Sequence, residues 1–205
     1  SMSPNELIMP DLSFLQENKI KLSALILTHA HEDHIGAVPY LYYQLNNVPI
    51  FTTSFTASVL KRKFMSNDVK DYDIRLLDYN KQISIGEFVI EIFALTHSIP
   101  EPNAIILKTH KGNIFHTGDW KIDPEPLIGK PIDLEKLKKI KSDGIDAMIC
   151  DSTNVFSAGK SGSELDVRKN MLNVMSRLKK RIIITSFASN VARMETAFYC
   201  AEQTG

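Results

Sequence analysis

The sequence predicts an α/β fold, and two observations support this prediction. Short apolar runs alternate along the chain with amphipathic segments, as they do when strands and helices follow one another. In addition, 43% of the 205 residues are hydrophobic. A chain of this length can bury roughly 70% of the surface that it exposes when unfolded. We therefore expect one large domain, or one domain with part of another.

Strands are expected where short apolar runs are bounded by polar or turn-forming residues. In chain order these are residues 22–28, 50–52, 74–77, 88–95, 104–109, 113–116, 147–150 and 181–186. Residues 110–113 include a glycine and are expected to form a hairpin turn between two of these strands. The strands at 22–28 and 147–150 are expected to be buried.

Amphipathic segments predict helices at residues 35–45, 55–65, 134–140, 164–178 and 190–201. In the first helix, Gly36 allows close packing and Pro39 falls in the first turn, where proline is tolerated. Ser163 is expected to cap the fourth helix. A solvated face is expected on the third helix, formed by Lys136, Lys138, Lys139 and Lys141.

The charge balance gives no global indication of a nucleic-acid partner. The chain has 24 Lys and Arg against 24 Asp and Glu, so its formal net charge is zero. Nucleic-acid binders neutralise phosphates with clustered positive charges, so any case for a charged polymer must come from a local site.

The apolar fraction excludes a disordered chain, and no apolar run approaches the ~18 residues of a membrane helix. No secretion signal is visible, and we expect a cytoplasmic protein without a membrane partner.

The two cysteines are not expected to form a metal site or a redox pair with each other. Cys150 and Cys200 lie 50 residues apart, a spacing that suggests neither a metal site nor a redox pair. Cys150 closes an apolar run and is expected to be a buried, inert thiol.

Four residues of metal-binding type follow the first predicted strand, namely His29, His31, Asp33 and His34. Residues two apart in an extended chain face the same way, so His29 and His31 can bind one ion together. Asp33 and His34 lie where the chain turns into a helix and can point to a second ion. Imidazole and carboxylate groups bind Zn²⁺ and similar divalent metals. The alternative is a polar strand-to-helix turn that binds no ion.

Two further candidate ligands follow later strands. His97 comes after the strand at 88–95 and Asp119 after the strand at 113–116, and α/β folds build their sites at such strand ends. The carboxylate of Asp119 can offer one oxygen to each of two ions, roughly 3.5–4 Å apart as in two-metal hydrolases. Taken alone, His97 could equally be a packing residue, but with the first cluster it completes a predicted two-metal centre.

The stretch at residues 28–34 resembles the His-x-His-x-Asp-His signature of the metallo-β-lactamase superfamily. Three longer stretches are similar to the ribonuclease J family of β-CASP nucleases: LTHAHEDHIGAVPYL, HSIPEPNAIILKTHKGNIFHTGDWKIDPEP and CDSTNVFSAGKSGSE. A fourth, TSFASNVAR at residues 185–193, is similar to the opening of that family's inserted β-CASP domain. The resemblance implies an incomplete metallo-β-lactamase αββα sandwich over residues 1–180 and the start of a β-CASP domain over residues 181–205.

The resemblance also implies the role of each ligand. One metal would be held by His29, His31 and His97, and the other by Asp33 and His34, with Asp119 bridging the two. The implied cofactors are two divalent ions, with Zn²⁺ expected first and Mn²⁺ as the alternative.

Three aspartates, Asp33, Asp119 and Asp151, are implied to be catalytic. Asp151 would orient a histidine that protonates the leaving oxygen. The alternative role for Asp151 is a cap at a strand-to-loop corner. His116 is expected to hold Asp119 through hydrogen bonds, and His110 is expected to lie on the surface.

The implied function is metal-dependent hydrolysis of RNA by a 5′-exonuclease, an endonuclease or both, in RNA maturation and decay, including rRNA processing. Two ions lower the pKa of a shared water, and hydroxide then attacks the phosphodiester in line. The ions also provide the local positive field that the neutral chain lacks. The implied partner is RNA, and the full-length protein is expected to be a homo-oligomer, either a dimer or a tetramer.

Members of the family extend beyond both ends of the region that resembles this chain. Their further sequence supplies the last histidine ligand of the second metal and the histidine proposed as general acid, whereas no histidine follows His116 here. We therefore expect the chain alone to bind metal weakly, at the three-histidine group first, and to show little or no nuclease activity.

Two other functions stay open. One is a different hydrolase on the same fold, of the glyoxalase II or transfer-RNA-processing kind, which would not need the stretches at residues 97–100 and 151–154. The other is a non-catalytic RNA-binding or assembly subunit. Such subunits typically lose metal ligands, whereas all six candidate ligands are present in this chain.

Overall fold

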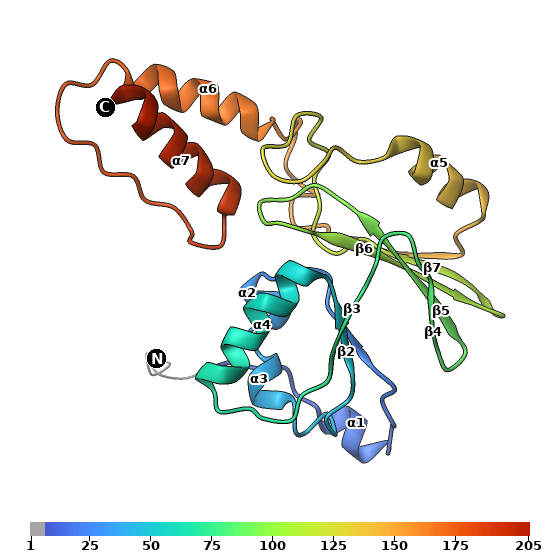
Figure 1. Ribbon diagram of the computed structural model, residues 1–205. Helices are drawn as coiled ribbons and strands as arrows, with labels where there is room; N and C mark the ends of the chain where they lie inside the picture. Colours follow the sequence, from blue (N-terminus) through green and yellow to red (C-terminus); the bar gives the residue numbers. More distant parts are fainter. Residues whose placement is uncertain (1–6) are drawn as a thin grey trace.

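The computed structural model describes residues 7–205 and contains two β-sheets with helices on their outer sides (Figure 1). The first sheet has three parallel strands in the order β1 (Leu25–Ile26), β2 (Ile50–Thr52) and β3 (Ile74–Leu76). Its parallel connections run through α2 (Glu32–Ile35), α3 (Val38–Leu41) and α4 (Ser54–Ser66). A short helix, α1 (Ser13–Glu17), precedes this sheet.

The second sheet has five strands in sequence order: β4 (Ile83–Ile85), β5 (Phe88–Ala94), β6 (Asn103–Thr109), β7 (Gly112–His116) and β8 (Ala147–Ile149). Neighbours from β4 to β7 are antiparallel, and β8 pairs in parallel with β7 after a crossover through α5 (Leu134–Ser142). Two further helices, α6 (Glu164–Met175) and α7 (Val191–Thr204), lie together apart from the sheets (Figure 1).

Apolar side chains form a core on the helix side of each sheet. One cluster joins the first sheet to its helices and includes Leu27, Ile35, Tyr42, Ile50, Leu60 and Phe64. Another joins the second sheet to α5 and includes Phe93, Leu95, Ile106, Phe115 and Ile140.

The opposite face of the second sheet meets the first sheet. Asn103 and Ile105 alternate with the α5-facing residues of β6, so both point to this opposite face. There the side-chain amide of Asn103 donates a hydrogen bond to the carbonyl oxygen of Thr28 (3.0 Å), directly after β1. The two sheets are therefore joined at the end of β1, where the candidate ligands begin.

Several predicted elements are confirmed. The predicted strand at residues 50–52 coincides with β2, and the predicted hairpin turn joins β6 to β7. Ser163 caps α6, since its hydroxyl oxygen accepts a hydrogen bond from the N–H of Leu165 (3.1 Å). His110 is exposed, as expected.

The helix predicted at residues 35–45 is interrupted between α2 and α3. Pro39 has no N–H to donate to the carbonyl of residue 35, and its ring clashes with the preceding turn of a continuous helix. A new helix therefore starts with Pro39 near its beginning. The short elements α1 and β4 were not among the predicted ones.

Predictions for the C-terminal half were wrong in three places. Residues 181–186 form no strand, because a strand needs a neighbour for its backbone hydrogen bonds. The predicted burial of β8 is also wrong: Met148 and Ile149 are 57% and 53% exposed. Cys150, predicted to be buried, is exposed. Both follow from the position of β8 at the edge of the sheet, with β7 as its only strand neighbour among the described residues.

The predicted solvated face of α5 is correct for three of its lysines, Lys138, Lys139 and Lys141. Lys136 is half-buried instead, because its ammonium group donates to the carbonyl oxygen of Tyr79 (3.2 Å) and lies 3.7 Å from the carboxylate of Glu91. In residues 7–205, no helix has both the length and the apolar character needed to cross a membrane.

Candidate metal centre

All six candidate ligands meet at one edge of the two sheets, although they come from three separate segments. These are the segment after β1 that leads into α2, the loop after β5 and the loop after β7. Within them, two groups of donor atoms lie close enough to hold an ion, with all atoms of a group within 4.8 Å of one another. The first group is His29, His31, His97 and Asp119, and the second is Asp33, His34 and Asp119.

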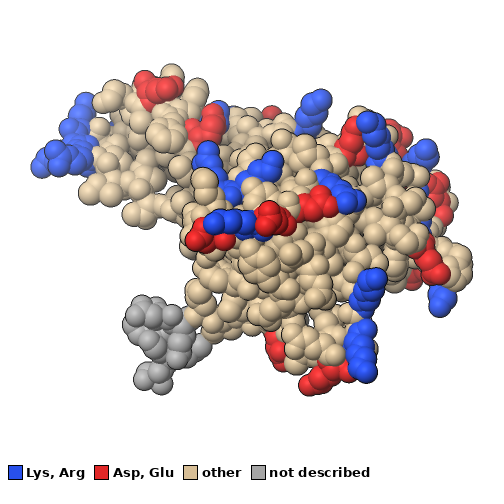
Figure 2. Space-filling model, turned by 60° about the horizontal axis from the view of Figure 1, so that its bottom comes forward, with Lys and Arg blue, Asp and Glu red and all other residues tan. Residues whose placement is uncertain are grey.

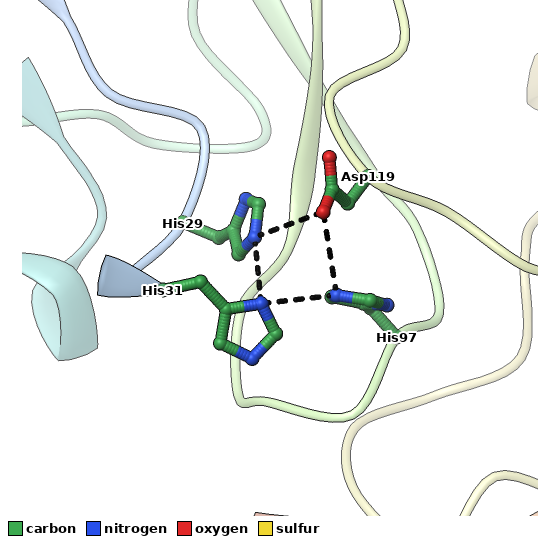
Figure 3. Close-up of side chains that lie close together, drawn as sticks. All are labelled: His29, His31, His97 and Asp119. Carbon is green, nitrogen blue, oxygen red and sulfur yellow. Dashed lines mark hydrogen bonds and ion pairs between the residues drawn. The ribbon is translucent and has the colours of Figure 1, made fainter. Parts of the chain in front are cut away.

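The first group has donor spacings suited to one metal ion (Figure 3). The Nδ1 atom of His31 lies 3.0 Å from Nε2 of His29 and 3.1 Å from Nε2 of His97. The Oδ2 atom of Asp119 lies 3.9 Å and 3.8 Å from the same two Nε2 atoms. Four donors around a tetrahedral Zn²⁺ ion, with bonds of about 2.1 Å, would be about 3.4 Å apart. The donor set therefore fits such an ion.

The second group shares Asp119 with the first through a different oxygen. Oδ1 of Asp119 lies 3.2 Å from Nε2 of His34, which is in turn 3.5 Å from Oδ2 of Asp33. The side chain of Asp33 is 77% exposed, whereas that of His29 is fully buried. The second group is thus the more open one, with three donors among the described residues.

Burial keeps the central histidines neutral. Burial, helped by the nearby imidazoles of His34, His31 and His97, lowers the pKa of His29 to about 2. Burial also lowers the pKa of His97, against the opposing influence of Asp119. Neutral imidazole is the form that binds metal, because a free nitrogen lone pair is required.

The surroundings orient the buried histidine. The tautomer that leaves Nε2 of His29 free has its proton on Nδ1, which then donates to the hydroxyl oxygen of Thr28, 3.0 Å away. Asn103 donates to the carbonyl oxygen of the same Thr28. This chain of hydrogen bonds fixes the ring of His29 relative to both sheets.

The two later ligand loops are joined by their backbones. Thr96, next to His97, forms an antiparallel bridge with Lys121, whose N–H donates to the carbonyl oxygen of Thr96 (3.0 Å). The N–H of Asp123 donates to the hydroxyl oxygen of Thr96 (3.1 Å). His97 and Asp119 are therefore held on two segments that cannot shift independently.

A glycine allows the chain to turn into Asp119. Gly118 has φ +58°, and a Cβ atom there would lie 2.8 Å from the carbonyl oxygen of Asn103. The sequence predicts a hydrogen bond between His116 and Asp119. In the structure, Nδ1 of His116 instead accepts a hydrogen bond from the N–H of Gly118 (3.0 Å). His116 thus supports the turn before Asp119.

Asp151 lies beside the first group and also caps a corner. Its Oδ1 atom accepts hydrogen bonds from the N–H and the hydroxyl of Thr153, at 2.9 and 2.7 Å. These bonds, the one from the N–H first, outweigh burial and lower the pKa of Asp151, with a smaller contribution from His97. The capping role is therefore present, and the carboxylate is within electrostatic reach of the metal ligands.

Glu101 also supports the site, although the sequence did not predict it. Glu101, in the same β5–β6 loop as His97, accepts a hydrogen bond on Oε2 from the N–H of Phe55 (2.8 Å), in the first turn of α4. A carboxylate at a helix N-terminus satisfies a free N–H and interacts well with the helix dipole. The two residues are 46 positions apart, so no local sequence signal could have revealed this contact.

Comparison with known proteins shows similarity over most of the chain. The family model described as "Beta-lactamase superfamily domain" matches residues 6–182. Ribonuclease J of Sinorhizobium meliloti is 39% identical over 98% of this chain and 36% of its own length. Ribonuclease J of Corynebacterium glutamicum is also 39% identical, over 94% of this chain and 27% of its own length. The chain thus spans about a third of the length of these curated relatives.

A solved structure resembles the fold. The crystal structure of a protein of unknown function from Enterococcus faecalis V583 superposes with a TM-score of 0.62 at 18% sequence identity. The match covers 98% of this chain and 55% of that one. At this identity the similarity extends to the fold alone.

Proposed function

The chain belongs to the beta-lactamase superfamily, and from this premise we propose that it carries the metal centre of a ribonuclease that hydrolyses RNA phosphodiester bonds. Membership confirms the predicted α/β metallo-β-lactamase fold class. The choice of RNA is supported by relatives named ribonuclease J, which match nearly the whole chain at 32–39% identity. The proposal includes 5′-exonucleolytic or endonucleolytic cleavage in RNA maturation and decay, including rRNA processing.

The observation that carries the proposal is the arrangement around Asp119. Its two carboxylate oxygens face two different donor groups, Oδ2 toward His29 and His97 and Oδ1 toward His34. In the proposal, the three histidines of the first group hold one divalent ion, Asp33 and His34 hold a second, and Asp119 contributes to both. When bound, two such ions, Zn²⁺ or alternatively Mn²⁺, supply a water of lowered pKa and stabilise negative charge on a phosphate.

The distribution of charged side chains on the surface agrees with attraction of phosphate at one site rather than over the whole surface. Over most of the face drawn in Figure 2, basic and acidic side chains are interspersed, as expected for a net charge of zero. The proposed positive field at the site would therefore come from the cofactors.

The chain's own residues have distinct tasks in this proposal. Thr28 holds the ring of His29 with Nε2 free for the cofactor. Asp33, at the open side, would place its carboxylate next to the substrate. Asp151, whose lowered pKa keeps it ionised, suits the role of accepting a hydrogen bond from a proton donor and orienting it, rather than donating a proton itself.

Three further features belong to the same proposal and rest on the resemblance to ribonuclease J. Residues 1–180 are proposed to form the metallo-β-lactamase domain and residues 181–205 the start of a β-CASP domain. The ribonuclease is proposed to act in the cytoplasm and as a homo-oligomer.

The test combines metal binding with two substrates. Calorimetric titration with Zn²⁺ is expected to show a tighter first site and a weaker second one, because the second group has fewer donors. Hydrolysis of 5′-phosphorylated RNA is expected to be slow or absent for this chain, and any hydrolysis is expected to stop on chelation and to be lost in Asp119→Asn. If the Asp119→Asn variant hydrolysed RNA as fast as an active wild-type chain does, the proposal would be refuted. Hydrolysis of a glutathione thioester in place of RNA would favour the alternative hydrolase, and metal-independent RNA binding without cleavage would favour a non-catalytic subunit.

A further inference from the structure

A second cluster of charged side chains lies where α6 and α7 meet the metal-ligand loops, with two buried carboxylates and two partly exposed cationic side chains. The ammonium group of Lys121 lies 3.2 Å from Oε1 of Glu164 and 3.3 Å from Oδ2 of Asp123. The other oxygen of Glu164, Oε2, lies 3.5 Å from Nε of Arg193. Asp123 and Glu164 are only 1% and 7% exposed. The carboxylate of Asp123 also accepts hydrogen bonds from the N–H groups of Glu164 and Glu125, both at 3.0 Å. Among the described residues, the carboxylate of Glu164 has only Lys121 and Arg193 as partners.

One end of this cluster is part of the metal centre. Lys121 follows Asp119 by two positions, and its backbone is bridged to Thr96, the neighbour of His97. The side chain of Lys121 then extends to Glu164, the first residue of α6. A displacement of Glu164 would therefore be transmitted to the segment that carries Asp119.

The other end returns to the same loops through α7. Arg193 lies in the first turn of α7, and the N–H of its neighbour Ala192 donates to the carbonyl oxygen of Ser98 (3.2 Å). Ser98 follows His97, and its hydroxyl lies 3.4 Å from Nε2 of His31. These contacts connect the segment that carries Asp119 to the loop that carries His97, with Glu164 between Lys121 and Arg193. The backbone bridge between Thr96 and Lys121 closes the ring.

Stability alone does not explain this arrangement of charged side chains. Buried ion pairs often fail to recover the cost of removing their charges from water. Here Oε2 of Glu164 and Nε of Arg193 lack a hydrogen-bond partner within residues 7–205. A separate ion pair, between Arg168 and Glu195, also joins α6 to α7. A buried, incompletely satisfied carboxylate that joins two ligand-bearing loops indicates a role in positioning.

We propose that Glu164 is a positioning residue of the metal centre, which holds Lys121 and Arg193 so that Asp119 and His97 keep the spacing that binds a divalent ion. This inference rests on the proposed metal centre. It assigns to α6 and α7 a part in setting metal affinity, although neither helix contributes a ligand.

The expected effect is a loss of metal affinity with the fold retained. Replacing residues that orient metal ligands typically weakens binding by about 10–100-fold. Glu164 acts through Lys121 and the backbone, so Glu164→Gln is expected to weaken binding by about tenfold, at the low end of that range. Lys121→Met breaks the same link, so the double variant is expected to lose little more than either single variant.

Glu195→Gln is the matched control. It removes the same charge from the same pair of helices, but it breaks the ion pair with Arg168 on α6 instead of the link to Lys121. Zn²⁺ affinity would be measured by calorimetry, and the ligand field by the visible absorption of the Co²⁺-substituted protein. Thermal unfolding in the presence of a chelator would show whether each variant is folded.

The outcomes separate this inference from the proposed function. Weaker Zn²⁺ binding and an altered Co²⁺ spectrum in Glu164→Gln, with both unchanged in Glu195→Gln, would support the inference. If the wild-type chain binds no metal, the proposed metal centre fails, and this inference fails with it. If the wild type binds metal and Glu164→Gln binds equally well, or Glu195→Gln loses as much affinity, the inference alone is overturned. Should Glu164→Gln not fold, Arg193→Gln takes its place, with weaker binding supporting the inference and unchanged binding overturning it.

Discussion

Gly118 offers a sharp test of how the turn before Asp119 positions the metal centre. An alanine Cβ there would lie 2.8 Å from the carbonyl oxygen of Asn103 and 3.1 Å from Cβ of Thr28. The residue also has φ +58°, a conformation that costs an L-residue roughly 1–2 kcal/mol. Crowding of a packed site typically costs about 1–3 kcal/mol more. Gly118→Ala is therefore expected to lower the free energy of unfolding by about 2–5 kcal/mol.

Gly86 provides the control for this prediction. It has the same φ of +58°, in the turn between β4 and β5, but its added Cβ would meet no atom within 4 Å among the described residues. Gly86→Ala should thus cost only the conformational part, about 1–2 kcal/mol. Urea unfolding in the presence of a chelator gives both free energies, and Zn²⁺ titration should show weaker binding in Gly118→Ala alone. Equal losses of stability in the two variants would refute the role of close packing at Gly118.

Two further predictions concern the supports of the site. Glu101→Ala should lower the free energy of unfolding by about 1 kcal/mol, because the N–H of Phe55 loses its cap; an unchanged urea midpoint would show that water replaces the carboxylate without loss. The metal-free protein should lose stability as the pH falls below 6.5, because the pKa of His29 is about 2 when folded against an ordinary value of 6.5. Below pH 6.5 the unfolded chain binds more protons than the folded one. The contribution of neutral His29 to the free energy of unfolding is therefore complete above pH 6.5 and declines toward pH 2. Urea midpoints from pH 8 to pH 5, measured with chelator, should fall for the wild type and fall less for His29→Gln; parallel curves would contradict this assignment.

Predictions based on local pattern succeeded where the physical cause is itself local. The hairpin turn before β7 and the cap at Ser163 each depend on residues a few positions apart. The strand at residues 50–52 has a local apolar pattern, but its backbone pairs with the distant strands β1 and β3. The candidate ligands also follow strand ends in the sequence, which is where chain direction allows side chains to gather. The break between α2 and α3 could also have been predicted. Pro39 is the fifth residue of a helix that starts at residue 35, so it lies beyond the first turn in which proline is tolerated.

The sequence alone determined the ligand types, their order along the chain and the α/β alternation, because these follow from residue chemistry and periodicity. The tertiary structure decided which donor atoms face each other. Oδ2 of Asp119 lies near His29 and His97, and Oδ1 lies near His34. The bridge between Thr96 and Lys121 joins the loops that carry His97 and Asp119. It also decided that Met148, Ile149 and Cys150 stay exposed, because burial depends on which segments cover a strand rather than on how apolar that strand is. Contacts between residues far apart in sequence leave no local pattern, and those contacts hold the metal centre together.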